Sequence, residues 1–193
     1  MSVFTIGHST HALDSFVGLL RRHGVDELAD VRSAPYSRFN PQFNRDSLAN
    51  SLVPHGIEYV FLGRELGGRP DDPACYENGR VRYDRVAATP VFQRALERII
   101  HDSAGRSVAL LCAEKEPLEC HRTLLVAQAL EARGVTAHHI RADGTLENHA
   151  AAMDRLLVIH GDPPQGELFT QDGDRIQRAI ARQTERMAAR RRK

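Results

Sequence analysis

The stretch of sequence that decides the fold most clearly is residues 107–122, which read SVALLCAEKEPLECHR. Its first six residues form a short aliphatic run, which is typical of a strand buried on both faces. The following residues are mostly polar and include Pro117, as expected of a loop. From His121 onward the apolar residues have helical spacing, to about residue 133. The stretch therefore predicts a strand that passes through a loop into a helix.

The same alternation of strand and helix recurs along the chain. Apolar runs at residues 3–6, 27–32, 57–61 and 135–140 predict four more strands, and amphipathic spacing predicts helices at residues 11–23, 46–55 and 89–103. Residues 63–79 are rich in Gly, Pro and Asp and are expected to be irregular. Because alternating strands and helices pair in parallel through helical crossovers, we predict an α/β fold: a mainly parallel sheet with helices on both faces.

The C-terminal part of the chain differs from the rest in composition. Residues 161–166 read GDPPQG, a linker by composition, and a last helix is expected at residues 174–193, outside the core. Residues 175–193 carry a charge of +7, whereas the remainder of the chain carries −6. We therefore predict an α/β domain at residues 1–160, followed by a linker and a basic C-terminal helix at residues 161–193.

Composition narrows the class of protein. A chain of 193 residues that is 41% hydrophobic suits one domain with a proper core. Three cysteines, an odd number, argue against a disulfide framework and favour a reducing compartment. No apolar run approaches the ~18 residues of a membrane span, and the first residues lack the features of a signal peptide. We expect a cytoplasmic protein without a membrane partner.

Polar residues follow the predicted strands at the points where these end. The strands at residues 3–6, 27–32 and 107–112 end in His8 and Ser9, in Asp30 and Arg32, and in Cys112 and Glu114, and the last strand delivers His138 and His139. Each residue alone is as readily explained as structural, for example as a helix cap. In open α/β sheets, however, ligands bind outside the carboxyl ends of the strands. The agreement among the strand ends therefore predicts a functional site there. The loops at residues 32–41 and 62–70 are candidates to line the same cleft, the second because its three glycines permit close backbone approach.

The helix predicted after residue 120 adds chemistry to that site. Its N-terminus offers free N–H groups to an anion, and Arg122 supplies donors suited to phosphate or carboxylate. A cysteine beside His121 and Arg122 is placed to have a lowered pKa and to react as a thiolate. Cysteine phosphatases share the order strand, Cys, loop, Arg and helix, but nine residues separate Cys112 from Arg122 instead of five, so a direct match fails.

Four interpretations of this segment stay open. Cys112 or Cys120 is a nucleophile at an anion site. Alternatively, Cys112, Cys120 and His121, joined by His8 or His139, bind a metal, although the spacing Cys-x7-Cys-His lacks the tight Cys-x2-Cys pair of most zinc sites and is a weak signal. In a third interpretation the cysteines are buried structure and Arg122 pairs with a carboxylate. In the fourth they only shape a pocket in which carboxylates, histidines and arginines react.

Two other segments suggest contact with nucleic acid. Arg32, Tyr36, Arg38 and Phe39 interleave arginine and aromatic side chains, which bind phosphate and stack on bases. Arginines recur at three- or four-residue steps along one face of the predicted last helix: Arg175, Arg178, Arg182, Arg186 and Arg190. That face is equally explained as a solvated helix that packs on the acidic body or on a second subunit. An oligomer is compatible with the sequence.

Four ordered motifs resemble the signature blocks of the bacterial and archaeal DUF488 proteins. They are TIGHS at residues 5–9, DVRS at 30–33 with Pro35 and Ser37-Arg38, LGRELGG at 62–68, and LCAE through PLECHR at 111–122. The resemblance covers about residues 3–141 and excludes the basic tail. It implies an α/β fold and a cytoplasmic prokaryotic protein, but it gives no established reaction, and the cofactor stays unknown. The motif positions are His8, Ser9, Asp30, Arg32, Arg38, Cys112, Glu114, Cys120, His121 and Arg122.

Together these patterns predict an enzyme that acts on a small anionic substrate, phosphorylated or nucleotide-like. The candidate catalytic residues are His8, Asp30, Cys112, Glu114, Cys120 and His121, and the candidate substrate-binding residues are Ser9, Arg32, Arg38 and Arg122. Histidine suits general acid–base work near neutral pH. The alternative is a non-catalytic protein that associates with nucleic acid through the basic helix and the Arg/aromatic loop.

Overall fold

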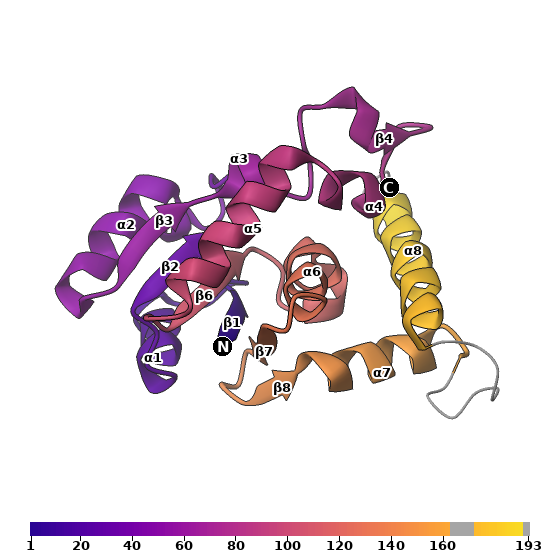
Figure 1. The fold of residues 1–193 in the computed structure, drawn as a ribbon. Helices are drawn as coiled ribbons and strands as arrows, with labels where there is room; N and C mark the ends of the chain where they lie inside the picture. The colour runs from indigo at the N-terminus through magenta and orange to yellow at the C-terminus, as the bar shows by residue number, and fades with distance from the viewer. Residues whose placement is uncertain (163–171, 191–193) are drawn as a thin grey trace.

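The computed structural model describes residues 1–162 and 172–190, and its centre is a six-stranded sheet in the order β3-β2-β6-β1-β7-β8 (Figure 1). The strands are β1 (Ser2–Gly7), β2 (Glu27–Asp30), β3 (Glu58–Phe61), β6 (Val108–Cys112), β7 (Thr136–Ile140) and β8 (Leu146–Asn148). The first five pair in parallel, and β8 pairs antiparallel with β7 at one edge. All five predicted strands are therefore present, in one mainly parallel sheet.

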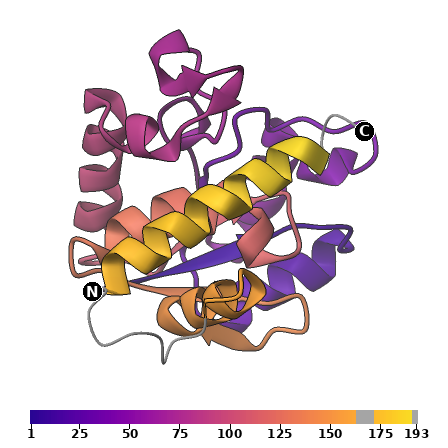
Figure 2. The same ribbon diagram turned by 90° about the vertical axis from the view of Figure 1, so that its right-hand side faces the viewer.

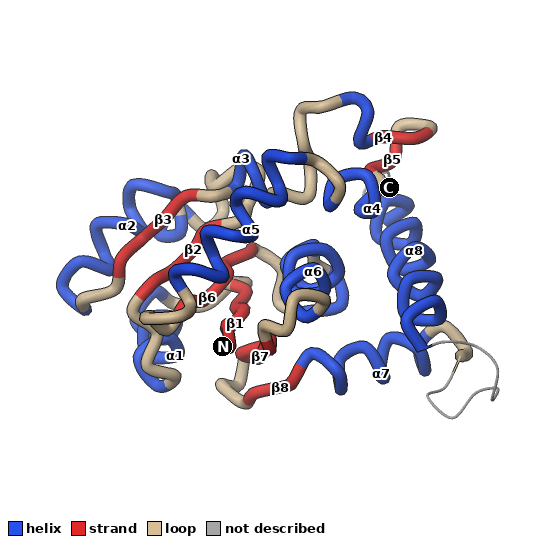
Figure 3. The backbone as a smooth tube through the Cα atoms, viewed as in Figure 1, coloured by secondary structure: helices blue, strands red, loops and turns tan. Residues whose placement is uncertain are grey.

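Helices cover both faces of this sheet (Figure 3). On one face α1 (Leu13–Arg22) and α2 (Arg45–Leu52) bury Phe16, Leu20 and Leu48 against Leu28 and Leu111 of the strands. On the other face α5 (Pro90–Asp102) packs with the helical segment that follows β6. The aliphatic run of β6 is buried throughout because both its faces are covered. The predicted α/β architecture is confirmed.

The helical segment after β6 is wider than a regular α-helix. It consists of a π-helix, η5 (Arg122–Ala127), and then α6 (Gln128–Glu131). All six residues of η5 are buried. Leu125 and Val126 pack in the apolar cluster between the sheet and α5, whereas Leu124 packs in a third apolar cluster, which also contains Leu118 and Leu156. The sequence predicted one regular helix here. Because apolar residues lie on every side of the segment, its hydrophobic pattern has no clear period that would distinguish an α-helix from a π-helix.

Several short elements lie where the sequence predicted irregular chain or nothing. The segment that connects β3 to α5 contains α3 (Gly63–Leu66), η3 (Pro73–Cys75), the hairpin of β4 (Tyr76–Glu77) and β5 (Arg80–Val81), and α4 (Tyr83–Ala87). Further 3-10 turns are η1 (Pro41–Phe43) and η4 (Pro117–Glu119), while η2 (Val53–His55) forms the end of the helix predicted at residues 46–55. Beyond β8, α7 (His149–Ile159) begins at Asn148, whose side chain accepts from Ala151 N. This N-cap starts a helix that the sequence patterns did not predict.

The C-terminal helix α8 (Asp172–Arg190) lies against the domain rather than outside its core. It contacts α7 and η4, and Figure 2 shows it running across the face that carries η5 and α6. Ala179, Ile180 and Met187 are buried in the third apolar cluster with Leu118 and Leu156. The expectation of a helix outside the core is therefore wrong; the basic helix itself is present.

The arginines of α8 do not share one environment. Arg175 is buried, and its Nη2 lies 2.7 Å from Asp162 Oδ1, whereas Arg178, Arg182 and Arg186 are exposed. The side chain of Arg190 and most of the predicted linker lie outside the described residues.

Among the described helices, none has the length and apolar character needed to cross a membrane.

Candidate functional site

Two cysteines and a histidine meet at the carboxyl end of β6. Cys112 is the last residue of that strand, and Cys120 and His121 end the loop that follows it. His121 Nδ1 lies 3.7 Å from Cys112 Sγ and 3.9 Å from Cys120 Sγ. The two sulfurs and one ring nitrogen lie within 4.8 Å of one another. We call these three side chains the Cys–Cys–His cluster.

The ring of His121 is fixed from its other side. Its Nε2 lies 2.8 Å from the carbonyl oxygen of Val31, in the loop after β2. A carbonyl only accepts hydrogen bonds, so Nε2 donates and therefore carries a proton. Gly68 packs against the ring, since a Cβ on Gly68 would lie 2.8 Å from His121 Cγ. These contacts hold Nδ1 toward the two sulfurs.

The three groups shift one another's pKa values. A hydrogen bond from Cys120, together with His121 and Arg122, holds the pKa of Cys112 well below its usual range, although burial opposes this shift. Burial and the adjacent Cys112 sulfur raise the pKa of Cys120 well above its usual range. Burial lowers the pKa of His121, but the Cys112 sulfur outweighs it and the net shift is upward. The surroundings therefore favour negative charge on Cys112 over Cys120.

The cluster forms one wall of a small pocket of about 140 Å³. The pocket is lined by Arg32, Ser33, Ala34, Gly68, Arg69, Tyr83, Cys112, Ala113, Glu114, Cys120 and His121. The sequence patterns identified five of these: Arg32, Cys112, Glu114, Cys120 and His121. Ser33 and Arg69 are linked, because Arg69 N donates to Ser33 Oγ at 3.1 Å. The pocket therefore joins the β2 loop, the β6 loop and the glycine-rich segment.

Asp30 lies beneath the pocket and holds Arg32. Arg32 Nε lies 2.9 Å from Asp30 Oδ1, and Nη2 lies 2.5 Å from Oδ2. Arg32 Nη2 also donates to the carbonyl oxygen of Phe43, and the Tyr59 hydroxyl donates to Asp30 Oδ2. Burial and the neighbouring Asp30 raise the pKa of Tyr59. Asp30 is completely buried, so its position is that of a group that orients Arg32.

Arg122 is completely buried and does not line the pocket. Its Nη1 donates to the carbonyl oxygen of Glu114 at 2.6 Å, and its Nη2 to that of Lys115 at 3.4 Å. A guanidinium fork that engages two carbonyls of the β6 loop fixes the course of that loop. The structure thus places Arg122 as a support of the cluster, behind the pocket wall.

The residues at the end of β1 support the same loop. The backbone N–H groups of His8 and Ser9 donate to the carbonyls of Cys112 and Ala113, both at 2.9 Å. The His8 ring stacks on Phe43 with 4.5 Å between ring centroids, and burial lowers its pKa. Ser9 has a φ of 48°, a left-handed conformation that is uncommon outside glycine. Neither residue lines the pocket, and neither does the exposed Arg38.

The two histidines of β7 lie elsewhere. His139 is the last but one residue of β7, but it pairs with Thr5, is fully buried and, like His138, does not line the pocket. A hydrogen-bonded chain runs from Thr5 Oγ1 to His139 Nδ1 (2.8 Å), from His139 Nε2 to His149 Nδ1 (3.2 Å), and from His149 Nε2 to Gln128 Oε1 (2.9 Å). The expectation that the last strand delivers His138 and His139 to the site is therefore wrong.

The prediction that residues 62–70 line the cleft agrees with the pocket, but the sequence patterns did not single out Gly68 and Arg69 as site residues. Gly68 and Arg69 lie far from Cys112 in sequence, and a Gly/Pro-rich composition indicates irregular backbone without saying where it packs. The usable signal is the glycine pair itself. A Cβ on Gly67 would lie 2.4 Å from Ser33 Oγ and one on Gly68 would strike His121, so both positions require close backbone approach.

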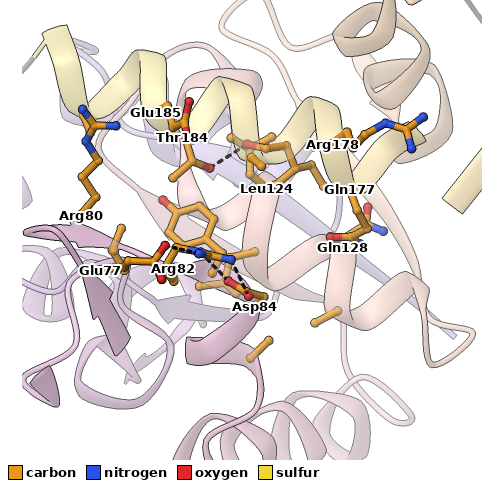
Figure 4. Close-up of a pocket in the computed structure, with 18 of the residues that line it drawn as sticks. Glu77, Arg80, Arg82, Asp84, Leu124, Gln128, Gln177, Arg178, Thr184 and Glu185 are labelled. Carbon is orange, nitrogen blue, oxygen red and sulfur yellow. Dashed lines mark hydrogen bonds and ion pairs between the residues drawn. The ribbon is translucent and has the colours of Figure 1, made fainter. Parts of the chain in front are cut away.

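A second, larger pocket of about 740 Å³ lies between α8 and the β4–β5 hairpin (Figure 4). Its walls carry Arg80, Arg178 and Glu185, and its floor includes Leu124 and Gln128. Tyr83 lines both this groove and the smaller pocket. The two pockets are therefore neighbours that share one aromatic side chain.

Comparison with known proteins gives one result. No curated protein and no solved structure matches this chain. A family model described as a domain of unknown function, DUF488, matches residues 12–129, which is more than half of the chain and includes the Cys–Cys–His cluster. The chain therefore belongs to the DUF488 family.

Proposed function

We propose that this protein is an enzyme that acts on a small anionic substrate, phosphorylated or nucleotide-like, at the pocket between the ends of β2 and β6. One observation carries the proposal. A single pocket brings the Cys–Cys–His cluster together with two arginines, Arg32 and Arg69. Reactive side chains beside arginines, at the carboxyl ends of parallel strands, are typical of an active site.

The size of the pocket supports an anionic group as its occupant. Drug-sized ligands need cavities of roughly 300–1,000 Å³. About 140 Å³ is much less, and suits a phosphate or carboxylate group together with the bond that reacts. A larger substrate has room for its remainder in the neighbouring groove, past Tyr83.

The residues have different roles in this proposal. Arg69 and Arg32 bind the anion, and the Cys–Cys–His cluster is the reacting centre. Glu114 lines the same pocket and is the carboxylate available for proton transfer. Arg122 and Asp30 are positioning residues, because both are buried behind the pocket wall and bond to its loops or to Arg32.

The test combines anion binding with turnover. Binding of inorganic phosphate and pyrophosphate is measured by titration calorimetry, and hydrolysis or transfer is measured on a panel of phosphate esters and nucleotides. Arg69→Ala should weaken binding and raise KM by 10-fold or more, because a charge-assisted hydrogen bond contributes about 1.5–3 kcal/mol.

The matched control is Arg64→Ala, an exposed arginine five residues earlier that does not line the pocket. It should leave binding and KM unchanged. Equal effects of the two substitutions, or a wild-type protein that neither binds the anions nor turns over any of the panel, would contradict the proposal.

A second candidate function is contact with nucleic acid. It is favoured by the Arg/aromatic loop, where Tyr36 is 74% exposed and Phe39 is 87% exposed on either side of Arg38. Large aromatics in solvent offer stacking platforms for unpaired bases. The variant Tyr36→Ala/Phe39→Ala should lower the affinity for a single-stranded oligonucleotide in fluorescence anisotropy. Unchanged affinity would remove this candidate.

A further inference from the structure

We propose that the Cys–Cys–His cluster binds one zinc ion, through Cys112 Sγ, Cys120 Sγ and His121 Nδ1. The zinc ion would be a cofactor of the proposed active site. The catalytic part of this proposal therefore rests on the proposed function. In the sequence, the spacing Cys-x7-Cys-His is only a weak signal for a metal and does not identify which one.

The distances fit tetrahedral coordination. Zinc bonds of about 2.3 Å to sulfur and 2.0–2.1 Å to nitrogen separate a sulfur from a nitrogen by about 3.6 Å at a tetrahedral angle. The observed separations are 3.7 Å for Cys112 and 3.9 Å for Cys120. Both sulfur–nitrogen separations therefore suit a zinc ion without large movement, and the two sulfurs lie within 4.8 Å of each other.

The orientation of His121 supports the same site. Metal-binding histidines usually donate their other ring N–H to a carbonyl or carboxylate, which fixes the tautomer and leaves the metal-facing nitrogen with its lone pair. The bond from His121 Nε2 to the Val31 carbonyl has this geometry. With Gly68 packed on the ring, the lone pair of Nδ1 is held toward both sulfurs.

The ligand set selects the class of metal. Thiolate and imidazole are ligands of zinc, whereas magnesium and calcium require oxygen ligands. Both cysteines are nearly inaccessible to solvent, with 5% and 1% of Cys112 and Cys120 exposed. Cysteine binds zinc as a thiolate, so binding by these two residues releases the protons that their thiol groups carry.

Three protein ligands mark a catalytic rather than a structural zinc site. Structural sites use four protein ligands, while catalytic sites keep one position for water or substrate, and two cysteines with one histidine occur in that class. All three ligand residues line the pocket that holds Arg32, Arg69 and Glu114. The fourth position therefore opens to the anion site, where zinc would make bound water acidic enough to react near neutral pH.

The first test is metal content. The full-length protein, purified without chelator, is analysed by mass spectrometry for bound metals, and its dissociation constant for zinc is measured by competition with a chromophoric chelator. We expect about one zinc per chain. Cys112→Ser and Cys120→Ser should weaken binding at least 100-fold, while Cys75→Ser should not, because Cys75 is buried outside the cluster.

Circular dichroism checks that each variant folds, and a cobalt-loaded wild-type protein keeps the test decisive if one does not. Cobalt bound by two thiolates should show an intense sulfur-to-metal charge-transfer band and the visible bands of tetrahedral coordination. The proposal would be overturned if the purified wild-type protein contained no metal and bound neither zinc nor cobalt. It would also be overturned if a variant with both Cys112 and Cys120 replaced bound the metal as tightly as the wild type.

Inorganic phosphate then tests the open position. Phosphate added to the cobalt protein should shift its visible bands, and the shift should be weaker in Arg69→Ala. Bound cobalt with an unchanged spectrum would overturn the catalytic assignment. If the protein binds no metal but turns over a substrate, the zinc site is overturned and the proposed enzyme activity stands. If the zinc site is filled but the protein shows neither anion binding nor turnover, the proposed enzyme activity is refuted.

Discussion

At the scale of single residues, Gly7 shows how tightly the ends of β1 and β6 are joined. A Cβ at this position would lie 1.8 Å from the carbonyl oxygen of Glu114 and 2.7 Å from Arg122 Nη1. Gly7→Ala should therefore displace the β6 loop and lower the free energy of unfolding by about 3 kcal/mol, as overpacking of a rigid site does.

Gly18 provides the matched control for this prediction. It lies within α1 and is exposed, and a Cβ at this position would have no neighbouring atom within 4 Å. Gly18→Ala should raise the free energy of unfolding by about 0.5–1 kcal/mol, because alanine loses less entropy in a helix. Urea unfolding measures both changes, and the same sign for both would show that the close approach at Gly7 has been misjudged.

The buried histidine chain predicts a dependence of stability on pH. Every hydrogen bond from Thr5 to Gln128 is satisfied when both histidines are neutral and protonated at Nε2. Burial lowers the pKa of His139 to about 2 and that of His149 to about 4. The unfolded chain therefore binds protons that the folded chain does not, and stability falls as pH drops below about 6.5.

The expected size of this effect is measurable. Between pH 7.5 and pH 5, His149 alone should lower the free energy of unfolding by about 2 kcal/mol. His149→Gln should make the dependence on pH shallower in urea unfolding, while His55→Gln, at an exposed histidine, should leave it unchanged. Identical pH profiles for wild type and His149→Gln would contradict this explanation.

At the scale of elements, α8 tests whether the C-terminal helix belongs to the folded unit. Ile180 is 5% exposed and packs in the cluster that joins α8 to α7. Ile180→Ala should lower the free energy of unfolding by about 2–4 kcal/mol in a single transition. Gln177→Ala, at an exposed position of the same helix, should change it by less than about 0.5 kcal/mol. A separate early transition would show that α8 unfolds independently.

The elements also show how much the sequence determines. Apolar runs such as that of β6 predicted all five parallel strands, because strands of a sheet covered on both faces are predominantly apolar. The sequence patterns did not predict the π-helix, because all six of its residues are buried. They did not predict α7, because its hydrophobic residues show only a weak helical pattern. The position of α8 depends on tertiary packing with α7, which a local pattern does not contain.

At the scale of the whole molecule, the parallel sheet brings the candidate site together. Cys112, Glu114, Cys120 and His121 meet because β6 and its loop are local in sequence, and Arg32 joins them because β2 pairs with β6. Polar residues at the strand ends predicted that meeting. They did not separate pocket-lining residues from their supports, because Asp30 and Arg122 are polar residues of the same segments and only tertiary packing keeps them out of the pocket lining. Gly68 and Arg69 arrive from a segment without a sequence period.

A crystal structure of the zinc-loaded protein with phosphate, recorded at the zinc absorption edge, would test the metal and the anion site together. We expect one anomalous peak bonded to Cys112, Cys120 and His121, and a phosphate beside Arg69 in the same pocket. Uncoordinated cysteines in that pocket, with the metal and the anion bound elsewhere or not at all, would refute both the zinc site and the anion site.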